Sequence, residues 1–262
     1  MKEILHEMHR WMNDYMRSFR TDDPNVMLGI RLKEIHTGYV TANARALAKH
    51  LGCSEHDTAL AEIIGLFHDV GRFRQYAVYQ PFNDAASEDH AELGLKVLAE
   101  DVDFLERLTP ADADVVRFAI KYHNKKEIAP TDDERKLFFA KLIRDADKLD
   151  IYRVLLPFLA PDGAEKAPNF VPSDAAQEVS PEFVADFAAG RQADYYRLRT
   201  HGDRKIVRLM WIYDINFMWT LRRIVERGYV DAFIESLPAQ EGIAEGVAHL
   251  RAYIERCCAR ND

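Results

Sequence analysis

The sequence predicts an all-α protein, and three observations support that fold class. Apolar residues recur three and four positions apart through most of the 262 residues, the spacing that puts side chains on one face of a helix. Residues that cap helices, or that end them, stand at the boundaries of these periodic segments. No strand of note and no internal repeat emerges from the pattern.

Two helices are expected at the beginning of the chain. Residues 1–20 carry apolar side chains at helical spacing and predict an amphipathic helix. The pattern is again helical from about Met27 to Leu51, and Gly52 follows as a C-terminal stop. His36 lies within this second helix.

Each of the next two expected helices carries a histidine on its apolar face. Ser54 is expected to cap a helix that leads to His68 and that Gly71 ends. Ser87 is expected to cap a helix with His90 in its first turn, and Gly94, one turn later, would let a neighbouring backbone approach.

The last two helices of this region follow after Thr109. Thr109 and Pro110 give a cap followed by proline at the first helical position, and His123 extends the apolar stripe of that helix. A further helix begins near Asp132 or Asp133 and places Asp147 on the stripe of its apolar residues. At 100° per residue, Asp145 points roughly the opposite way.

The remainder of the chain divides into a loop and more helices. Residues 157–181 hold several prolines and few periodic apolar residues, so they predict a loop excursion that lies over the site. Helices are then expected over Arg204–Gly228, in a shorter piece that ends at Leu237, and in a last segment. The polar and aromatic residues within the first of these helices favour a structural network over a substrate pocket; they are Trp211, Tyr213, Asp214, Asn216 and Trp219.

Composition excludes several classes of protein. The net charge of −8 at pH 7 and the absence of a long basic stripe argue against general nucleic-acid binding. No apolar stretch is long enough to span a bilayer, and the first residues lack the apolar core of a signal peptide. Three cysteines form no even framework, so a cytoplasmic location is expected.

Six ionisable side chains on core-facing stripes are expected to converge inside one bundle. Burying them is costly unless something charged compensates, and a divalent metal ion is the usual compensation. Imidazole and carboxylate ligands together suit Mn, Fe, Co, Ni or Zn, with one or two ions bound. The expected metal ligands are His36, His68, Asp69, His90, His123 and Asp147.

The order of these residues along the chain resembles that of the HD domain superfamily of metal-dependent phosphohydrolases. The resemblance covers roughly residues 30–155 and depends on His36, the dipeptide His68-Asp69, and Asp147. It implies an all-helical HD-type bundle in a single domain of residues 1–262, in which residues 156–262 form a helical extension packed on the core. His90 and His123 fall on the additional histidines of the branches that bind two metal ions, and Asp69 is the natural bridging ligand.

The resemblance implies hydrolysis of a small phosphate ester by metal-activated hydroxide. Expected catalytic residues are Asp69, His90, His123 and Arg72, and other cations near the ligands could grip phosphate; these are Arg74, Lys121, Lys125, Lys126, Arg144 and Lys148. The expected partner is a small phosphorylated substrate such as a nucleotide.

Two other functions stay open at this point. The same six-residue pattern is similar to that of mixed-valent diiron oxygenases of the HD superfamily, and a non-catalytic module that binds metal and nucleotide is a third possibility. No Gly-Tyr-Pro triplet occurs, which argues against hydrolysis of a cyclic dinucleotide. The pattern does not fix the substrate, the native metal or the oligomeric state.

Overall fold

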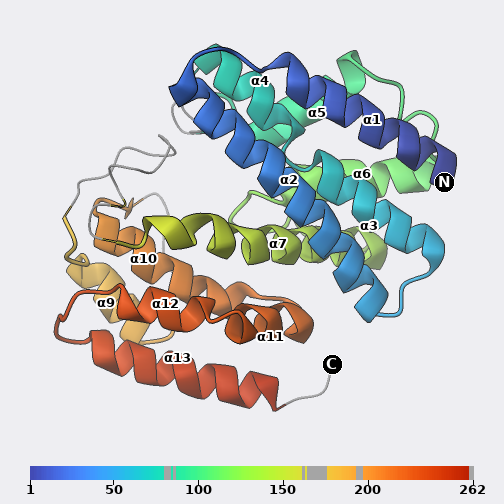
Figure 1. The fold of residues 1–262 in the computed structure, drawn as a ribbon. Coiled ribbons are helices and arrows are strands. Elements are labelled where there is room, and N and C mark those ends of the chain that lie inside the picture. The colour runs from blue at the N-terminus through green and yellow to red at the C-terminus, as the bar shows by residue number, and fades with distance from the viewer. Residues whose placement is uncertain (80–83, 85–86, 161–162, 164–175, 193–196, 260–262) are drawn as a thin grey trace. The chain divides into compact units, whose positions relative to one another are not determined.

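The computed structural model describes residues 1–79, 84, 87–160, 163, 176–192 and 197–259 (Figure 1). These residues form helices joined by short connections, and they contain no β-strand, which confirms the all-α prediction. Within this described part, no helix combines the length and the apolar composition needed to cross a membrane. The chain divides into two compact units, of which the first lies within Met1–Asp150 and the second begins at Ile151.

The first unit contains the helices that carry the histidines (Figure 1). Their caps explain where several of them begin: Asp23 accepts backbone N–H groups of α2, Ser54 of α3 and Thr109 of α6. The helices are α1 (Lys2–Ser18), α2 (Pro24–His50), α3 (Glu55–Phe67), α4 (Val70–Tyr79), α5 (His90–Glu100), α6 (Pro110–Tyr122) and α7 (Glu134–Leu155), the last of which continues into the second unit.

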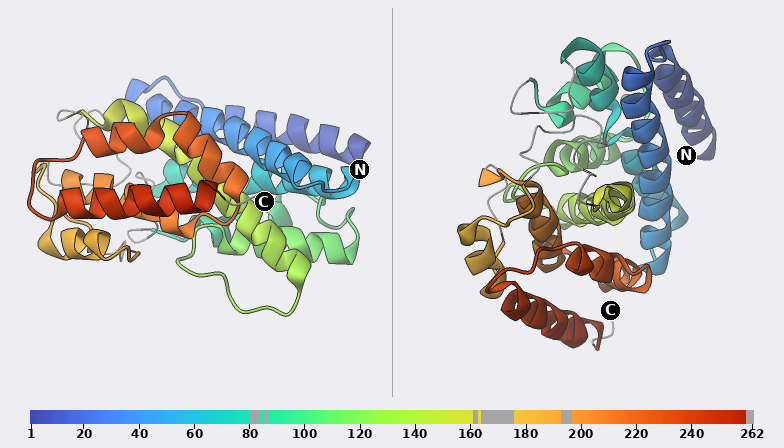
Figure 2. Two further views of the ribbon diagram at one scale, coloured as in Figure 1. Left: turned by 90° about the horizontal axis from the view of Figure 1, so that it is seen from below. Right: turned by 60° about the vertical axis from the view of Figure 1, so that its left-hand side comes forward.

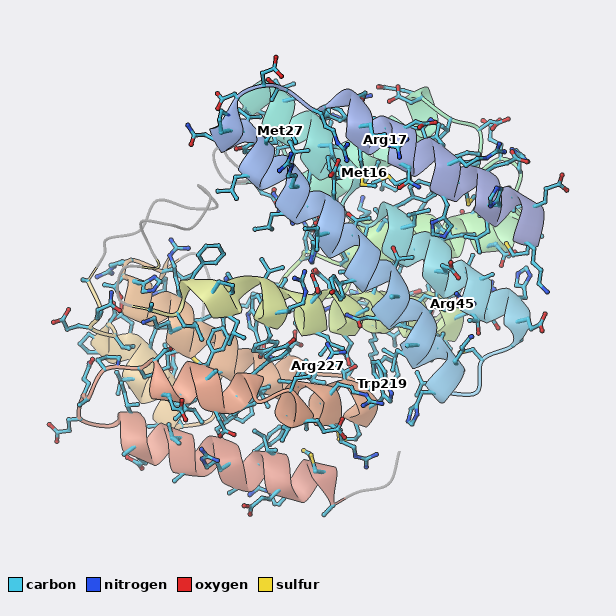
Figure 3. The ribbon with its side chains drawn as sticks, in the orientation of Figure 1. Met16, Arg17, Met27, Arg45, Trp219 and Arg227 are labelled. Atoms are coloured by element: carbon cyan, nitrogen blue, oxygen red, sulfur yellow. The ribbon has the colours of Figure 1, made fainter. Side chains whose placement is uncertain are left out.

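Helix α7 provides much of the core of the first unit. Almost every residue from Phe139 to Asp150 is buried, so this helix is covered on nearly all sides. Helix α2 packs against α3, α3 packs against α1 and α6, and α4 packs against α5. A hollow of about 240 Å³ on this unit is lined by Met16 and Arg17 of α1 and Glu34 of α2, among others. Figure 3 labels Met16 and Arg17 on α1.

The second unit is built from shorter helices. Helix α13 packs against α9 and α11, and α10 packs against α9 and α12; Figure 2 shows these helices in orange and red. The elements are η2 (Leu156–Phe158), α9 (Pro181–Ala188), α10 (His201–Met210), η4 (Trp211–Asp214), α11 (Met218–Glu226), α12 (Tyr229–Glu235) and α13 (Ile243–Cys258). The expectation that residues 156–262 pack on the core stays a prediction.

Three expected boundaries in these elements are wrong. Gly71 does not end a helix, because α4 begins at Val70, directly after Asp69. Ser87 does not cap α5; Asp89 does, since its carboxylate accepts the N–H groups of Ala91 and Glu92. The expected helix Arg204–Gly228 is two helices separated by η4, and the backbone is extended at Ile215.

Two helices were not expected from the sequence, and the loop excursion is only partly described. Helix α4 follows α3 after only two residues, His68 and Asp69, and α9 is short. In the excursion 157–181, residues 161–162 and 164–175 lie outside the described residues, and so does the prediction that this segment covers the site. The aromatic residues of η4 pack on other rings: Trp211 lies against Tyr152, and Tyr213 against Tyr253.

Candidate metal centre

The dipeptide His68-Asp69 lies at the junction of two helices of the first unit. Helix α3 ends at Phe67, His68 keeps helical backbone angles, and α4 begins at Val70. The amide N–H of Arg72 donates to the carbonyl of Asp69 at 2.9 Å. Both side chains are buried, with His68 0% and Asp69 3% exposed. The junction of α3 and α4 therefore holds two adjacent polar side chains within the core.

The first group of side chains consists of His36, His68 and Asp147. Their nearest ligand atoms all lie within 4.8 Å of one another. Nε2 of His36 lies 3.1 Å from Oδ1 of Asp147 and 3.4 Å from Nε2 of His68. Helices α2 and α7 and the end of α3 thus each contribute one member.

The second group consists of Asp69, His90 and His123. Nε2 of His90 lies 3.2 Å from Oδ1 of Asp69 and 3.0 Å from Nε2 of His123. His90 is the first residue of α5, and His123 directly follows α6. All three side chains are buried.

Asp69 connects the two groups through its two carboxylate oxygens. Oδ1 faces His90 and His123, at 3.2 and 3.7 Å from their Nε2 atoms. Oδ2 lies 3.5 Å from Nε2 of His36 and 3.5 Å from Nε2 of His68. One carboxylate therefore presents a different oxygen to each group, the arrangement that a bridging ligand needs.

Each of the four histidines is fixed through its other ring nitrogen. Nδ1 of His68 donates to the carbonyl of Gly65 at 2.8 Å, and Nδ1 of His123 donates to that of Ile120 at 2.7 Å. The other two histidines meet carboxylates instead: Nδ1 of His36 lies 2.6 Å from Asp150, and Nδ1 of His90 lies 2.7 Å from Asp84. Each group therefore holds one histidine fixed by a backbone carbonyl and one fixed by a carboxylate.

This arrangement fits bound cations. When Nδ1 donates its proton to an acceptor, a neutral imidazole presents an unprotonated Nε2. Facing lone pairs only 3.0 and 3.4 Å apart repel one another unless a positive charge lies between them. Imidazole nitrogens supported by carboxylates and carbonyls are the usual surroundings of transition-metal ligands. His36, His68 and Asp147 would hold one ion, His90 and His123 a second, and Asp69 would contact both.

The electrostatics keep the carboxylates charged and one histidine neutral. Burial lowers the pKa of His68 to about 4, so this ring is uncharged near neutral pH. Burial opposes ionisation of Asp69, but the charge of Lys33 is foremost among the effects that hold its pKa well below the usual range. For Asp147 burial again raises the pKa, but the neighbouring groups, His36 first among them, lower it by more. The site thus presents anionic oxygens to any cation.

Three residues of the site were not expected from the sequence. Asp150 and Asp84 support His36 and His90, and Nζ of Lys33 lies 2.7 Å from Oδ2 of Asp69. Lys33 and Asp150 stand three residues from His36 and Asp147 on their helices, so helical spacing could have indicated both. Asp84 precedes α5 and has no such periodic signal.

Arg72 lies beside the site, in the first turn of α4. Its Nε is 3.7 Å from Oδ1 of Asp69, and its Nη1 donates to Asp84 and to Gln75, at 2.7 Å in both cases. The same carboxylate, Asp84, therefore fixes both Arg72 and His90. Burial raises the pKa of Asp84, but the hydrogen bond from His90 and the charges around it lower that pKa far more.

The other expected phosphate contacts are less suitable. Arg74 pairs with Glu100 and Asp101, Lys121 pairs with Glu92, and Lys125 pairs with Asp89. Arg144 donates to backbone carbonyls that include that of Tyr122. Lys148 is buried, and Lys126 is exposed.

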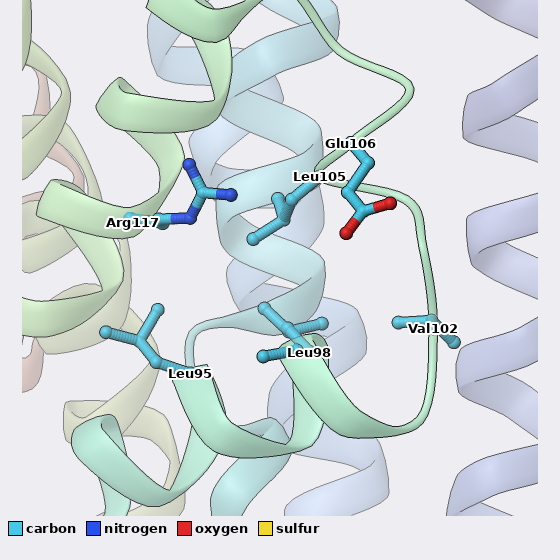
Figure 4. A pocket seen from close by; sticks show the side chains of 7 residues that line it. Leu95, Leu98, Val102, Leu105, Glu106 and Arg117 are labelled. Atoms are coloured by element: carbon cyan, nitrogen blue, oxygen red, sulfur yellow. The ribbon is translucent and has the colours of Figure 1, made fainter.

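Among the described side chains in and beside the two groups, several are partly exposed, and Asp84, beside His90, is 30% exposed. The side chain of Asp147 is 17% exposed, that of Arg72 15% and that of Lys33 13%. A separate hollow of about 150 Å³, lined by residues such as Leu98, Leu105 and Arg117, contains none of the six residues of the two groups (Figure 4). A ligand would therefore reach the candidate centre on the side of these partly exposed residues.

Comparison with known proteins agrees with this geometry. Residues 34–152 match the family model of the HD domain. Searches of the curated proteins and of the solved structures each found no match. The matched segment contains both groups of the candidate metal centre, which confirms the resemblance to the HD domain over residues 34–152.

Proposed function

We propose that the protein is a metal-dependent phosphohydrolase that acts on a small phosphate ester, such as a nucleotide. HD domains are in general metal-dependent hydrolases, and this chain has the residues that such chemistry needs. The single observation that carries the proposal is the placement of Asp69, whose two oxygens face two separate groups of ligands. That placement supports two neighbouring cations, which is typical of enzymes that displace groups at phosphorus.

Bound divalent cations would lower the pKa of a water molecule and offset negative charge on the phosphoryl oxygens. The chain itself supplies orientation and charge. Asp84 and Asp150 hold His90 and His36 so that Nε2 of each ring points to the centre. Because Nδ1 of His90 and of His123 is already engaged, only Nε2 of each ring remains for a role in the reaction.

Arg72 is the residue that we assign to the phosphoryl group. Its guanidinium lies beside Asp69, and Asp84 and Gln75 hold Nη1 while Nε is buried and has no hydrogen-bond partner among the described residues. An arginine fixed on one edge can offer its remaining N–H groups to an anionic oxygen.

Activity assays on protein purified without added ions test this function. The metal content is measured first, and the same sample is then incubated with nucleotides and simple phosphate esters, with and without oxygen. We expect phosphate release that does not depend on oxygen, and its loss in Asp69→Asn. Turnover that requires oxygen and releases no phosphate would contradict the proposal and favour oxygenase chemistry.

A matched pair of arginine variants tests the role of Arg72. Arg72→Met should raise KM for the ester about tenfold or more, because a charge-assisted contact to phosphate is lost. Arg74→Met is the control, since Arg74 lies on the same helix but pairs with Glu100 and Asp101. Equal effects of the two substitutions would argue against a specific role for Arg72.

A further inference from the structure

Lys33 contacts the carboxylate that connects the two groups of the candidate centre. Its Nζ lies 2.7 Å from Oδ2 of Asp69, while Nε of Arg72 lies 3.7 Å from Oδ1 on the other side. Resting on the proposed function for the identity of the anion, we infer that Lys33 is a second phosphate-binding residue, whose ammonium contacts a phosphoryl oxygen of the substrate when metal ions are bound.

Helix α2 gives Lys33 this position. Lys33 precedes His36 by three residues, so both side chains lie on the same face of the helix, one turn apart. His36 is 2% exposed, whereas the side chain of Lys33 is 13% exposed. The helix thus directs the imidazole into the core and keeps the ammonium where solvent and a ligand can reach it.

The contacts of the neighbouring cations distinguish Lys33 from them. Lys125 pairs with Asp89, and Lys121 pairs with Glu92; neither acid belongs to the two groups. The carboxylate that holds Lys33, in contrast, is itself a candidate metal ligand. Any change in the charge of Asp69 therefore acts directly on Lys33.

Bound metal ions would change how strongly the carboxylate of Asp69 attracts Lys33. A carboxylate that shares its negative charge with divalent cations attracts an ammonium less strongly than a free carboxylate does. The hold of Asp69 on Lys33 should then weaken, and the ammonium can form a charge-assisted hydrogen bond with an anionic oxygen. Lys33 and Arg72 would then contact such an oxyanion from two sides of Asp69.

Titration calorimetry with inorganic phosphate tests this inference on the full chain loaded with Mn²⁺. We expect Lys33→Met to weaken phosphate binding about tenfold or more, the loss of one charge-assisted contact, and Lys33→Arg to lose less. Lys49→Met is the matched control, because Lys49 is an exposed residue near the end of the same helix. Elemental analysis of each sample should show the metal content of the wild type.

Two outcomes would overturn the inference. If Lys33→Met binds phosphate as tightly as the wild type does, Lys33 does not contact the anion. If Lys33→Met loses its bound metal, the residue serves only to hold Asp69. The test does not require turnover, so a wild type that hydrolyses no ester while Lys33→Met still loses phosphate affinity would refute the proposed function and leave this inference standing.

Discussion

The partners at Nδ1 give the four histidines of the centre different kinds of support. His68 and His123 each donate to the carbonyl three residues earlier in their own helix, so local backbone structure orients them. His36 and His90 depend on the side chains of Asp150 and Asp84. The first pair should therefore keep its orientation as long as its helices form, while the second pair can be disturbed by one substitution.

Replacing Asp150 tests this difference directly. Asp150→Asn keeps the size of the side chain but removes the charge that faces Nδ1 of His36, and we expect metal affinity to fall about 10- to 100-fold. Asp114→Asn is the control, because Asp114 is 60% exposed and its pairs with Arg117 and Lys136 are both long, at 3.6 Å. Equal metal affinities in both variants, measured by competition with a chelator, would show that Asp150 does not orient a ligand.

Two aspartates near the centre should respond differently to truncation. Asp69→Ala should abolish catalysis and metal retention, because Asp69 faces both groups. Asp145 lies outside both groups and is fully buried, so Asp145→Ala should keep its metal but lose about 2 kcal/mol of stability. Elemental analysis and urea unfolding of the two variants separate these effects, and metal loss from Asp145→Ala would be contrary to the placement of α7.

At the residue scale, the sequence predicts the six side chains but not their supports. His36, His68, His90, His123 and Asp147 all extend apolar rows of helices, so helical periodicity directs them inward. Asp84 and Asp89 belong to a segment without periodicity, and their partners depend on how α4, α5 and α6 pack. Tertiary packing of that kind leaves no local signal.

At the scale of elements, the centre depends on close contact between α4 and α5. A Cβ atom on Gly71 would meet the carbonyl oxygen of His90 at 2.2 Å and the amide nitrogen of Gly94 at 2.5 Å. Both atoms belong to the backbone and cannot move aside without shifting α5. The expected role of Gly94 in letting a backbone approach is confirmed, and Gly71 is its counterpart rather than a helix stop.

Alanine substitutions at two glycines test this contact. Gly71→Ala should cost about 3 kcal/mol or more and should weaken metal binding, because His90 moves with α5. Gly38→Ala is the control, since nothing lies within 4 Å of its Cβ position in the middle of α2. That variant should be neutral or more stable by up to about 1 kcal/mol. Thermal and urea unfolding provide the comparison, and a fully stable Gly71→Ala would disprove the close approach.

A carboxylate at the beginning of α6 links three elements. Asp112 accepts hydrogen bonds from Thr109 at 2.8 Å and from Nε2 of His56 at 3.0 Å, and it forms a 2.8 Å pair with Arg135. Burial raises its pKa, but these partners together lower it from the usual value of 3.8. A lowered pKa in the folded state means that the charged form stabilises the fold above that usual value.

The pH dependence of a neutral variant tests this contribution. Asp112→Asn should be less stable than the wild type by about 1–3 kcal/mol near neutral pH. The difference should shrink as the pH falls below 3.8 and through the lower folded-state pKa, where the wild-type carboxylate also becomes neutral. Urea unfolding at a series of pH values measures it, and a difference that does not vary with pH would mean that charge is not the cause.

The boundaries of elements were predictable where a cap or a glycine lies in the sequence. Thr109 with Pro110 marks the beginning of α6, and Gly52, with a positive φ of 71°, follows the end of α2. The junction at His68-Asp69 was not predictable, because no glycine or proline separates α3 from α4 and His68 keeps helical backbone angles. Its geometry comes from packing rather than from local propensity.

At the scale of the whole molecule, the centre draws its ligands from α2, α5, α6, α7 and the junction of α3 with α4. All six ligand residues lie within Met1–Asp150, and the HD match covers residues 34–152. The fold class followed from the helical spacing of the apolar residues. The convergence of distant side chains followed because buried ionisable groups need a compensating charge. The break of the expected helix Arg204–Gly228 did not, since apolar spacing continues across η4.

Metal stoichiometry tests the central claim that Asp69 joins two cation sites. The wild type and two variants, Asp147→Asn and Asp69→Ala, are equilibrated with Mn²⁺ by dialysis, and the metal per chain is then determined by elemental analysis. The account predicts two ions in the wild type, about one in Asp147→Asn and none retained in Asp69→Ala. A wild type that binds no metal, or an Asp69→Ala variant that binds as much as the wild type does, would contradict it.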